Sequence, residues 1–248
     1  MQKANPVLTP NFVYTTETKN IFSKDWKDCG NFWEHVAEQG TDEWKNARIG
    51  RVNGSNSGSM GNKSRFKTAE ETGKIIAGVA TETFSPEALE RMNKGTKNEP
   101  VVRNWYEKEY NCKVLERGLC VLKTDITIGA SVDGDVLNTD KIIEIKCPVK
   151  MYRPLLTYME NTEHGWKPEK DYVGHIWETH YCQMQQGMFV LNKKYCDYIV
   201  YSDSDSQIFT QRISFNPVFW KEHYKLIKEN YNKYVLPHLK PGYPISPF

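Results

Sequence analysis

The sequence predicts an α/β fold with a central mixed sheet flanked by helices. Two observations support this prediction: the chain contains two kinds of hydrophobic pattern, and these patterns alternate along it. Helical spacing comes first, several short strand-like runs follow, and a helix, two strands and a final helix complete the chain. Because helices and strands are interleaved rather than separated, we expect a single core.

The first residues of the chain differ from the rest. Up to about residue 30 they mix Pro, Thr, Asn and Lys without periodicity, so we expect an extended arm over residues 1–37 and a single domain over residues 38–248. The N-terminus lacks the apolar core of a signal peptide, and no stretch is long and apolar enough to span a membrane. We therefore expect an intracellular protein, in the cytoplasm or nucleus of a host cell, that is not secreted and has no membrane partner.

The composition is that of an ordinary soluble globular protein. Among 248 residues, 39% are hydrophobic and 26% are charged, and the formal net charge is only +2. Such a small charge does not by itself indicate a nucleic-acid partner. The six cysteines form no C-x-x-C pair, which argues against a zinc site and a secreted disulfide scaffold and favours a reducing compartment.

Helices are predicted in the first half of the domain. The stretch 53–64 is rich in Gly, Ser and Asn, so it is either a loop or a tight helix entry. Ser85 followed by Pro86 is a favourable helix start, and Gly95 is a suitable end for that helix. A second helix is predicted over residues 100–110.

A meander of strands is predicted next, because short apolar runs are separated there by turn residues. The stretch that follows, residues 147–173, contains Pro148, Pro154 and Pro168 and is predicted to be irregular. The strand-like runs of the meander lie at residues 114–115, 119–122, 127–132 and 141–146.

The chain is predicted to end in a helix, two strands and a final helix. Helical spacing over residues 175–191 precedes strand-like runs at residues 195–201 and 207–215. Apolar and aromatic residues then recur on one stripe of the last helix, and such a stripe is more often core packing than a base-stacking platform. The stripe consists of Trp220, Tyr224, Ile227, Tyr231, Tyr234 and Val235.

The run IIEIKCPVK combines apolar residues with two opposite charges. On a strand, Glu144 and Lys146 stand side by side on one face, while the isoleucines fill the other. Asp133 lies eleven residues before Glu144, and the turn-rich residues between them allow a hairpin that brings the two carboxylates together. Paired carboxylates suit Mg²⁺ or Mn²⁺, and Lys146 could orient or deprotonate an attacking water. Asp followed by Glu-x-Lys on the next strand is the catalytic arrangement of the PD-(D/E)xK nucleases.

Simpler interpretations of this segment stay open. Asp133-Gly134-Asp135 could form only a hairpin turn, since Asp-Gly is a favoured turn pair. Glu144 could instead form an ion pair with its neighbouring lysine on a solvated face. An EF-hand calcium loop is excluded, because Leu137 occupies the third ligand position and no glutamate closes the loop.

Five motifs occur in order over about residues 38–190. In content and order they resemble the family of phage lambda exonuclease and YqaJ-like viral recombinase nucleases. The resemblance implies a PD-(D/E)xK restriction-endonuclease-like core and Mg²⁺-dependent digestion of double-stranded DNA from a 5′ end, which leaves 3′ single-stranded overhangs for recombination. The motifs are EQGTDEWKNARIGRVNGS (38–55), GKIIAGVA (73–80), MNKGTKNEP (92–100), GASVDGDV with EIKCP (129–148) and HYCQMQQGMFV (180–190).

The resemblance also implies roles for individual residues at the predicted metal site. Asp133 and Glu144 match the metal-binding carboxylates, and the backbone carbonyl of Ile145 would complete the metal shell. Lys146 matches the lysine of the family's Glu-x-Lys motif. Glu99 matches a helical glutamate that approaches the metal through water or a second ion.

Further matches concern the scissile phosphate and the strand end. Gln183 resembles the glutamine that helps to place the nucleophile and the scissile phosphate, although taken alone it could be a surface residue; Gln185 is the weaker candidate. Arg48 and Ser55 match an arginine and a serine that bind the terminal 5′-phosphate. Ser131 matches a second serine of that phosphate site.

Two of these matches have ordinary alternatives. Arg48 could instead pair with Asp42 or Glu43, and Glu99 could be a helix N-terminal acid that the helix dipole favours. Pro100, directly after Glu99, could also kink or begin the helix there and shift the carboxylate.

The resemblance implies partners as well: double-stranded DNA with 5′-phosphorylated ends, a single-strand annealing protein, and two further copies of the chain in a trimer around DNA. The arm and an insertion at residues 160–174 leave the assembly open. Two other functions compete: an endonuclease of the same fold, such as a DNA resolvase or an RNA-cleaving alkaline nuclease, and a non-catalytic nucleic-acid-binding module. The intact Asp133, Glu144 and Lys146 speak against the binding module.

Overall fold

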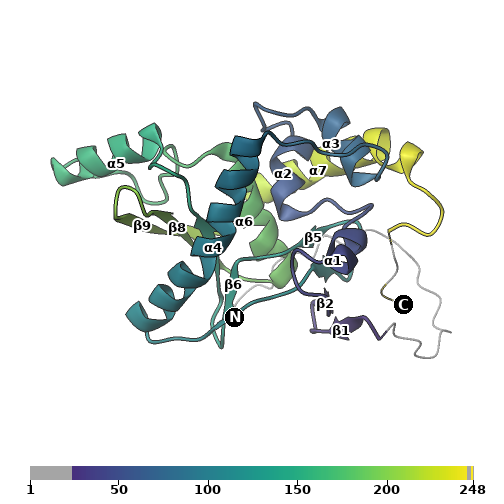
Figure 1. The fold of residues 1–248 in the computed structure, drawn as a ribbon, viewed down its shortest axis with the longest axis horizontal. Coiled ribbons are helices and arrows are strands. Elements are labelled where there is room, and N and C mark those ends of the chain that lie inside the picture. Colours follow the sequence, from purple (N-terminus) through teal and green to yellow (C-terminus); the bar gives the residue numbers. More distant parts are fainter. Residues whose placement is uncertain (1–23, 245–246, 248) are drawn as a thin grey trace, which may run out of the picture.

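A five-stranded mixed sheet forms the centre of the computed structural model, which describes residues 24–244 and 247 (Figure 1). Its strand order is β3-β6-β7-β8-β9, in which β7 and β8 are parallel and all other neighbours are antiparallel. The predicted α/β fold with a mixed sheet flanked by helices is confirmed. The strands are β3 (Val114–Leu115), β6 (Gly134–Val136), β7 (Lys141–Lys146), β8 (Tyr195–Ser202) and β9 (Gln207–Ser214).

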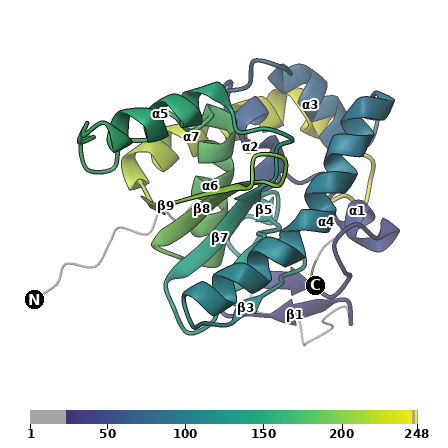
Figure 2. The same cartoon turned by 60° about the vertical axis from the view of Figure 1, so that its left-hand side comes forward.

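Helices cover both faces of this sheet. Helix α4 (Pro86–Glu109) packs on one face and α6 (Glu178–Leu191) on the other (Figures 1 and 2). Ile143 and Ile145 of β7 belong to a buried cluster with residues of α4, whereas Ile142 packs with residues of α6. The face of β7 toward α4 is therefore apolar and buried, and the charged side chains predicted for its other face point toward α6.

Helix α4 is one continuous helix where the sequence predicts two. The predicted start is confirmed, because Ser85 caps the helix by accepting from the N–H of Ala88 at 3.2 Å. The predicted end at Gly95 is wrong. Pro100 lies inside the helix and cannot donate to the carbonyl of Thr96, but the turns that follow are buried against the sheet and hold the helix together.

A second, four-stranded antiparallel sheet has the order β1-β2-β4-β5. The predicted meander is thus divided between two sheets. The arm predicted up to residue 37 is wrong for residues 26–35, because Trp26, Phe32 and Trp33 are buried and their backbone pairs into this sheet. Residues 1–23 of that arm lie outside the described residues. The strands are β1 (Trp26–Asp28), β2 (Phe32–His35), β4 (Cys120–Leu122) and β5 (Gly129–Ala130).

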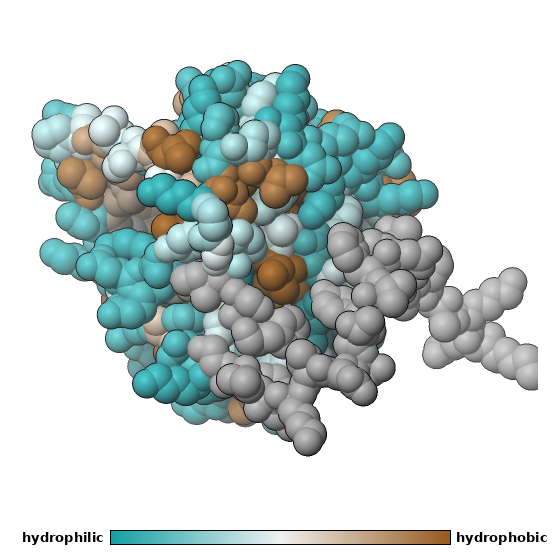
Figure 3. Space-filling view, turned by 90° about the vertical axis from the view of Figure 1, so that its right-hand side faces the viewer, coloured by the Kyte–Doolittle hydropathy of each residue, from teal (hydrophilic) through white to brown (hydrophobic). Residues whose placement is uncertain are grey.

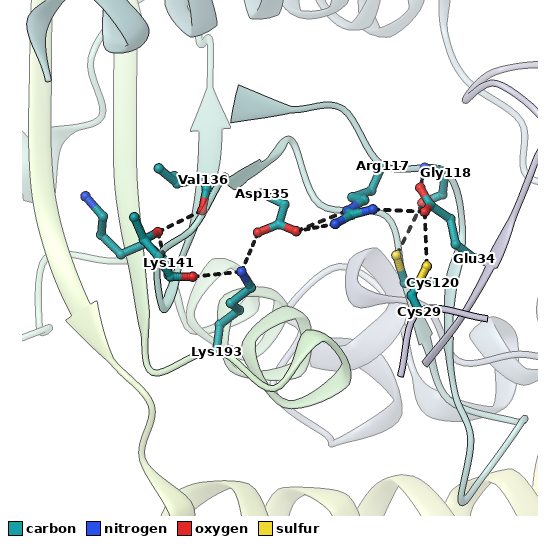
Figure 4. Close-up of polar contacts among 10 residues, drawn as sticks. Cys29, Glu34, Arg117, Gly118, Cys120, Asp135, Val136, Lys141 and Lys193 are labelled. Carbon is teal, nitrogen blue, oxygen red and sulfur yellow. Dashed lines mark hydrogen bonds and ion pairs between the residues drawn. The ribbon is translucent and has the colours of Figure 1, made fainter. Parts of the chain in front are cut away.

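Arg117 connects the two sheets (Figure 4). It donates to Glu34 of β2 at 3.1 Å and to Asp135 of β6 at 2.7 Å. Lys193 lies 2.6 Å from the other oxygen of Asp135, so this buried carboxylate is balanced by two cations. The alternative in which Asp133-Gly134-Asp135 forms only a hairpin turn is wrong, because Asp135 belongs to β6 and the turn into β7 lies at residues 137–140.

The remaining helices surround this framework. Helices α2, α3 and α7 gather beside α6 at one end of the molecule, and α5 lies at the other (Figure 1). The irregular stretch predicted at 147–173 is partly wrong, because α5 starts there with Pro154 in its first turn, where the missing N–H is harmless. The predicted final helix is confirmed. These helices are α1 (Asp42–Ala47), α2 (Gly54–Met60), α3 (Ala69–Ile76), α5 (Arg153–Glu163), α7 (Pro217–Tyr234) and the short η1 (Leu236–His238).

The surface carries no extended apolar area on the face drawn in Figure 3. That face is mainly hydrophilic, and its hydrophobic residues lie in separate small patches. Over the part of the chain that the structure describes, no helix is both long and apolar enough to cross a membrane.

Candidate active site

The C-terminal end of β7 opens into a cleft of about 510 Å³, here called the active-site cleft. It is bordered by the middle of α4, the first turns of α6, and α1 and α2. Every residue favoured from the sequence lines this cleft except Glu144, which lies beneath it with 2% of its surface exposed; the weaker candidate Gln185 does not line it. The residues brought together are Arg48, Ser55, Glu99, Ser131, Asp133, Ile145, Lys146 and Gln183.

Asp133 stands immediately before β6 and is level with Glu144. Strands β6 and β7 pair with Gly134 opposite Ile143, so the hairpin predicted between the two acids is confirmed. Oδ2 of Asp133 accepts a hydrogen bond from the N–H of Ile145 at 2.6 Å. This bond fixes the carboxylate against the end of β7.

Lys146 forms two polar contacts at the floor of the cleft. Its Nζ lies 2.5 Å from Oε1 of Glu144 and 3.2 Å from Oε1 of Gln183. The ion pair considered from the sequence therefore exists, but it is buried rather than solvated. Gln183 comes from α6, so it holds the lysine from the side opposite to β7.

The acids of the cleft repel one another. Burial, with the charge of Asp133, raises the pKa of Glu144 to about 8. Burial also raises the pKa of Asp133, and burial together with the Asp133 charge raises the pKa of Glu99. Burial alone would lower the pKa of Lys146, but the charges of Glu144 and Asp133 raise it, so this side chain stays protonated.

The donor set of the cleft fits a hard divalent cation such as Mg²⁺. Its donors are carboxylate and backbone oxygens, which such cations prefer, and a bound cation would offset the repulsion that raises the pKa of the acids. Cys147 also lines the cleft, but burial raises the pKa of its thiol to about 12, so it is a poor soft ligand. Within residues 24–244, no three His, Cys, Asp or Glu side chains converge as a ready-made metal cluster.

Glu99 reaches the cleft from the middle of α4. Its neighbours on the cleft side of that helix are Met92, Gly95 and Thr96. The interpretation of Glu99 as a helix N-terminal acid is wrong, since α4 begins thirteen residues earlier at Pro86. Because α4 continues through Pro100, the carboxylate stays within electrostatic range of Asp133.

In the same cleft, Arg48 contacts one serine directly and is linked to a second serine by a tryptophan. Arg48 donates to Oγ of Ser55 at 2.9 Å, and its guanidinium lies 4.2 Å from the centre of the Trp44 ring. The indole N–H of Trp44 donates to Oγ of Ser131 at 3.1 Å. Sequence reasoning missed Trp44, although its position four residues before Arg48 on a helix is a usable signal.

Geometry also decides two alternatives. Asp42 pairs with Lys45 at 3.0 Å rather than with Arg48, which lines the cleft. Gln185 is buried and hydrogen-bonded to the β9–α7 connection at 3.0 and 2.8 Å, so it fastens the core and does not face the cleft.

The family model of the YqaJ-like viral recombinase domain matches residues 43–194, which is more than half of the chain. The chain belongs to this family. The matched stretch of the YqaJ-like protein contains every residue of the active-site cleft named from the sequence.

Solved structures agree with this assignment. The alkaline exonuclease LHK-Exo from Laribacter hongkongensis is 26% identical to this YqaJ-like protein, with a TM-score of 0.61 over 80% of this chain and 94% of that chain. Its complex with dAMP gives 27% identity and the same TM-score over the same shares. A phage-related exonuclease from Haemophilus somnus 129PT, at 14% identity and a TM-score of 0.50 over 74% and 94%, is similar in fold alone. No curated protein matches.

These comparisons confirm the predicted family and show that the YqaJ-like protein has a PD-(D/E)xK-like fold. The family and the exonuclease neighbours also support a nuclease function for it.

The raised pKa of Glu144 predicts a pH-dependent stability for the metal-free protein. The ordinary pKa of 4.5 becomes about 8 in the fold, so between these values the folded state keeps a proton that the unfolded chain has lost. The stability linked to that proton is complete below about pH 4.5 and is lost as the pH rises through about 8. We expect the Tm in EDTA to fall across this window.

Glu144→Gln should flatten this decline, because the amide has the shape of the acid and no charge. Glu90→Gln, at an exposed position on α4, is the matched control and should keep the wild-type slope. Thermal denaturation in EDTA at a series of pH values measures all three proteins. Equal slopes for wild type and Glu144→Gln would contradict the assigned shift.

Proposed function

We propose that the chain is a Mg²⁺-dependent exodeoxyribonuclease, with Mn²⁺ as an alternative ion, that digests linear double-stranded DNA from 5′ to 3′ and leaves 3′ overhangs. One observation carries the proposal: the same cleft contains an acidic, lysine-bearing group and an arginine–serine group. Because the arginine–serine group would bind the end of a DNA strand beside the acidic residues that cut it, such an enzyme would act at DNA termini.

The metal would be held by Asp133, Glu144 and the carbonyl of Ile145. When bound, Mg²⁺ lowers the pKa of a coordinated water and polarises the phosphodiester. Asp133 is kept in position by the N–H of Ile145. This oxygen donor set is the part of the cleft that would recognise the ion.

Lys146 would act as a fixed cation rather than as a base. Its raised pKa keeps Nζ protonated, and Glu144 and Gln183 hold this group between β7 and α6. A protonated amine at that point orients the attacking water and offsets the charge that develops on the phosphate. Gln183 is then a positioning residue, since it acts through the lysine.

Arg48 would bind the terminal 5′-phosphate, assisted by the hydroxyls of Ser55 and Ser131. A guanidinium offers paired donors to phosphate oxygens, and a terminal phosphate carries more charge and more free oxygens than an internal diester. Trp44 holds both the guanidinium and one hydroxyl in place. This arrangement favours DNA with 5′-phosphorylated ends as the substrate.

One digestion tests the proposed function. Linear duplex labelled at either the 5′ or the 3′ end is incubated with Mg²⁺ or with EDTA, beside closed circular duplex and duplex RNA. We expect early release of the 5′ label as mononucleotide in Mg²⁺ only, with circular DNA and RNA intact. Cleavage of the circle would favour the endonuclease alternative, and digestion in EDTA would refute the metal requirement.

The 5′ end gives a separate prediction. Wild type should digest 5′-phosphorylated duplex faster than 5′-hydroxyl duplex, and Arg48→Ala should reduce this preference about 10-fold to 100-fold, the range for a lost charge-assisted hydrogen bond. Arg48→Lys should restore it only in part, because lysine cannot bind the phosphate through two paired donors. Initial rates on both substrates measure the ratio.

Lys45→Ala is the control for Arg48→Ala, since it removes a cation from the same helix that is paired with Asp42. It should keep the wild-type ratio. An Arg48→Ala enzyme with an unchanged preference would remove Arg48 from the site.

We extend the proposal to two partners. The reaction leaves single-stranded 3′ overhangs, so a single-strand annealing protein is a fitting partner, and three copies of the chain could enclose the duplex. Light scattering of the purified protein tests the trimer.

A further inference from the structure

A second cleft, of about 410 Å³, lies at the N-terminal end of α6 and is here called the aromatic cleft. Its lining combines two exposed aromatic rings with two cations, Lys63 and Arg65. Phe66 is 79% exposed and Trp177 is 40% exposed, and the centres of their rings are 6.4 Å apart. None of these side chains belongs to the active-site cleft.

The charges of the aromatic cleft are only partly neutralised. Lys63 pairs with Glu178 at 3.3 Å. Arg65 is exposed, and over residues 24–244 no ion pair engages it. A free guanidinium beside exposed rings is complementary to phosphates and bases, which are the two chemical parts of a nucleic-acid strand.

One side of α6 leads from this cleft to the active-site cleft. Trp177, His180 and Gln183 follow one another at intervals of three residues, and the rings of Trp177 and His180 are stacked 5.4 Å apart. Six residues of helix span about 9 Å, which is within the reach of one or two nucleotides. Gln183 in turn contacts Lys146, so α6 connects the aromatic cleft with the proposed cutting position.

We propose that the aromatic cleft binds single-stranded DNA next to the cutting position, with an unpaired base on Phe66 and Trp177 and phosphates at Lys63 and Arg65. An unpaired base offers a free face to the rings, whereas a base within a duplex is covered by its neighbours. This inference deepens the proposed function and rests on it.

Binding of a fluorescent 12-nucleotide oligothymidylate, measured by anisotropy in EDTA, tests the proposal without cleavage. Phe66→Ala should bind about 5-fold to 100-fold more weakly, the range for losing one stacked base. The ring is exposed, so the melting temperature should not change. Trp166→Ala is the control, because that ring is 43% exposed but lies outside the cleft.

An abasic strand of the same length separates stacking from charge. Wild type should bind it more weakly than oligothymidylate, and this difference should be smaller for Phe66→Ala, which keeps only the Trp177 ring. Arg65→Glu should weaken both strands and reduce the salt dependence of binding. Unchanged oligothymidylate binding by Phe66→Ala, or equal wild-type affinity for the two strands, would overturn the proposal.

The outcomes also separate this site from the proposed function. If the wild type digests duplex DNA but Phe66→Ala binds single strands normally, the single-strand site in the aromatic cleft is refuted and the nuclease proposal stands. A wild type that binds single strands through Phe66 but does not digest duplex in Mg²⁺ refutes the nuclease proposal and supports the binding site.

Discussion

Asp133→Asn should lower the rate of duplex digestion at least about a thousandfold. The change removes one of the two carboxylates proposed to hold Mg²⁺, and a metal contributes several kcal/mol to stabilising the transition state. The fold should survive, because the amide oxygen of asparagine can still accept from the N–H of Ile145. Loss of a charge from the acidic group should also relieve repulsion on Glu144.

Asp133→Ala separates the two roles of this side chain. It should be equally inactive, but it leaves the N–H of Ile145 without its acceptor and should be less stable than Asp133→Asn by about 1–3 kcal/mol. Initial rates in saturating Mg²⁺ and urea denaturation of both variants measure the two effects. An Asp133→Asn enzyme with near wild-type rates would exclude Asp133 as a metal ligand.

Lys146→Ala should lower kcat by about two orders of magnitude or more, the scale for losing a group that stabilises charge in the transition state. Removal of the amine leaves Glu144 buried beside Asp133 without its cation, so the pKa of Glu144 should rise further. Part of the lost activity should therefore return at higher pH. DNA affinity should change far less than kcat.

Gln183→Ala is the informative comparison for Lys146→Ala. It removes one of the two contacts that hold the amine and leaves the charge pair with Glu144 intact, so we expect a smaller loss, about 10-fold, without the shift in pH profile. The pH dependence of kcat distinguishes the two variants. If Lys146→Ala binds weakly but cuts normally at saturation, Lys146 is only a phosphate contact.

The sequence predicted the parts of the fold that depend on local pattern. The hydrophobic period alone predicts strand β7, the two strands after α6 and the last helix. It failed where tertiary contacts override a local signal. Gly95 and Pro100 are good helix breakers in isolation, but burial of the later turns of α4 outweighs them. Strands β1 and β2 are too short to show a hydrophobic period, and β2 joins the sheet by pairing with β4, about ninety residues away.

The cleft was predicted through motif order rather than through spacing. Asp133 and Glu144 could be joined by a local hairpin, but Arg48 and Gln183 reach the same cleft from distant helices. No periodicity reveals such convergence. The hydrophobic pattern does not distinguish Gln183 from Gln185, which the resemblance ranks second, and the rotation of α6 turns the first toward the cleft and the second toward the core.

The contacts of Arg117 with both sheets imply that the folded domain extends beyond the residues that the family model matches. Residues 43–194 contain the whole proposed active site, yet a chain that started at residue 43 would lose Glu34 and strand β2. Arg117 would then keep only Asp135 as a partner, and β4 would present an open edge. Since Asp135 stands two residues after Asp133, such trimming would loosen the active site from a distance (Figure 4).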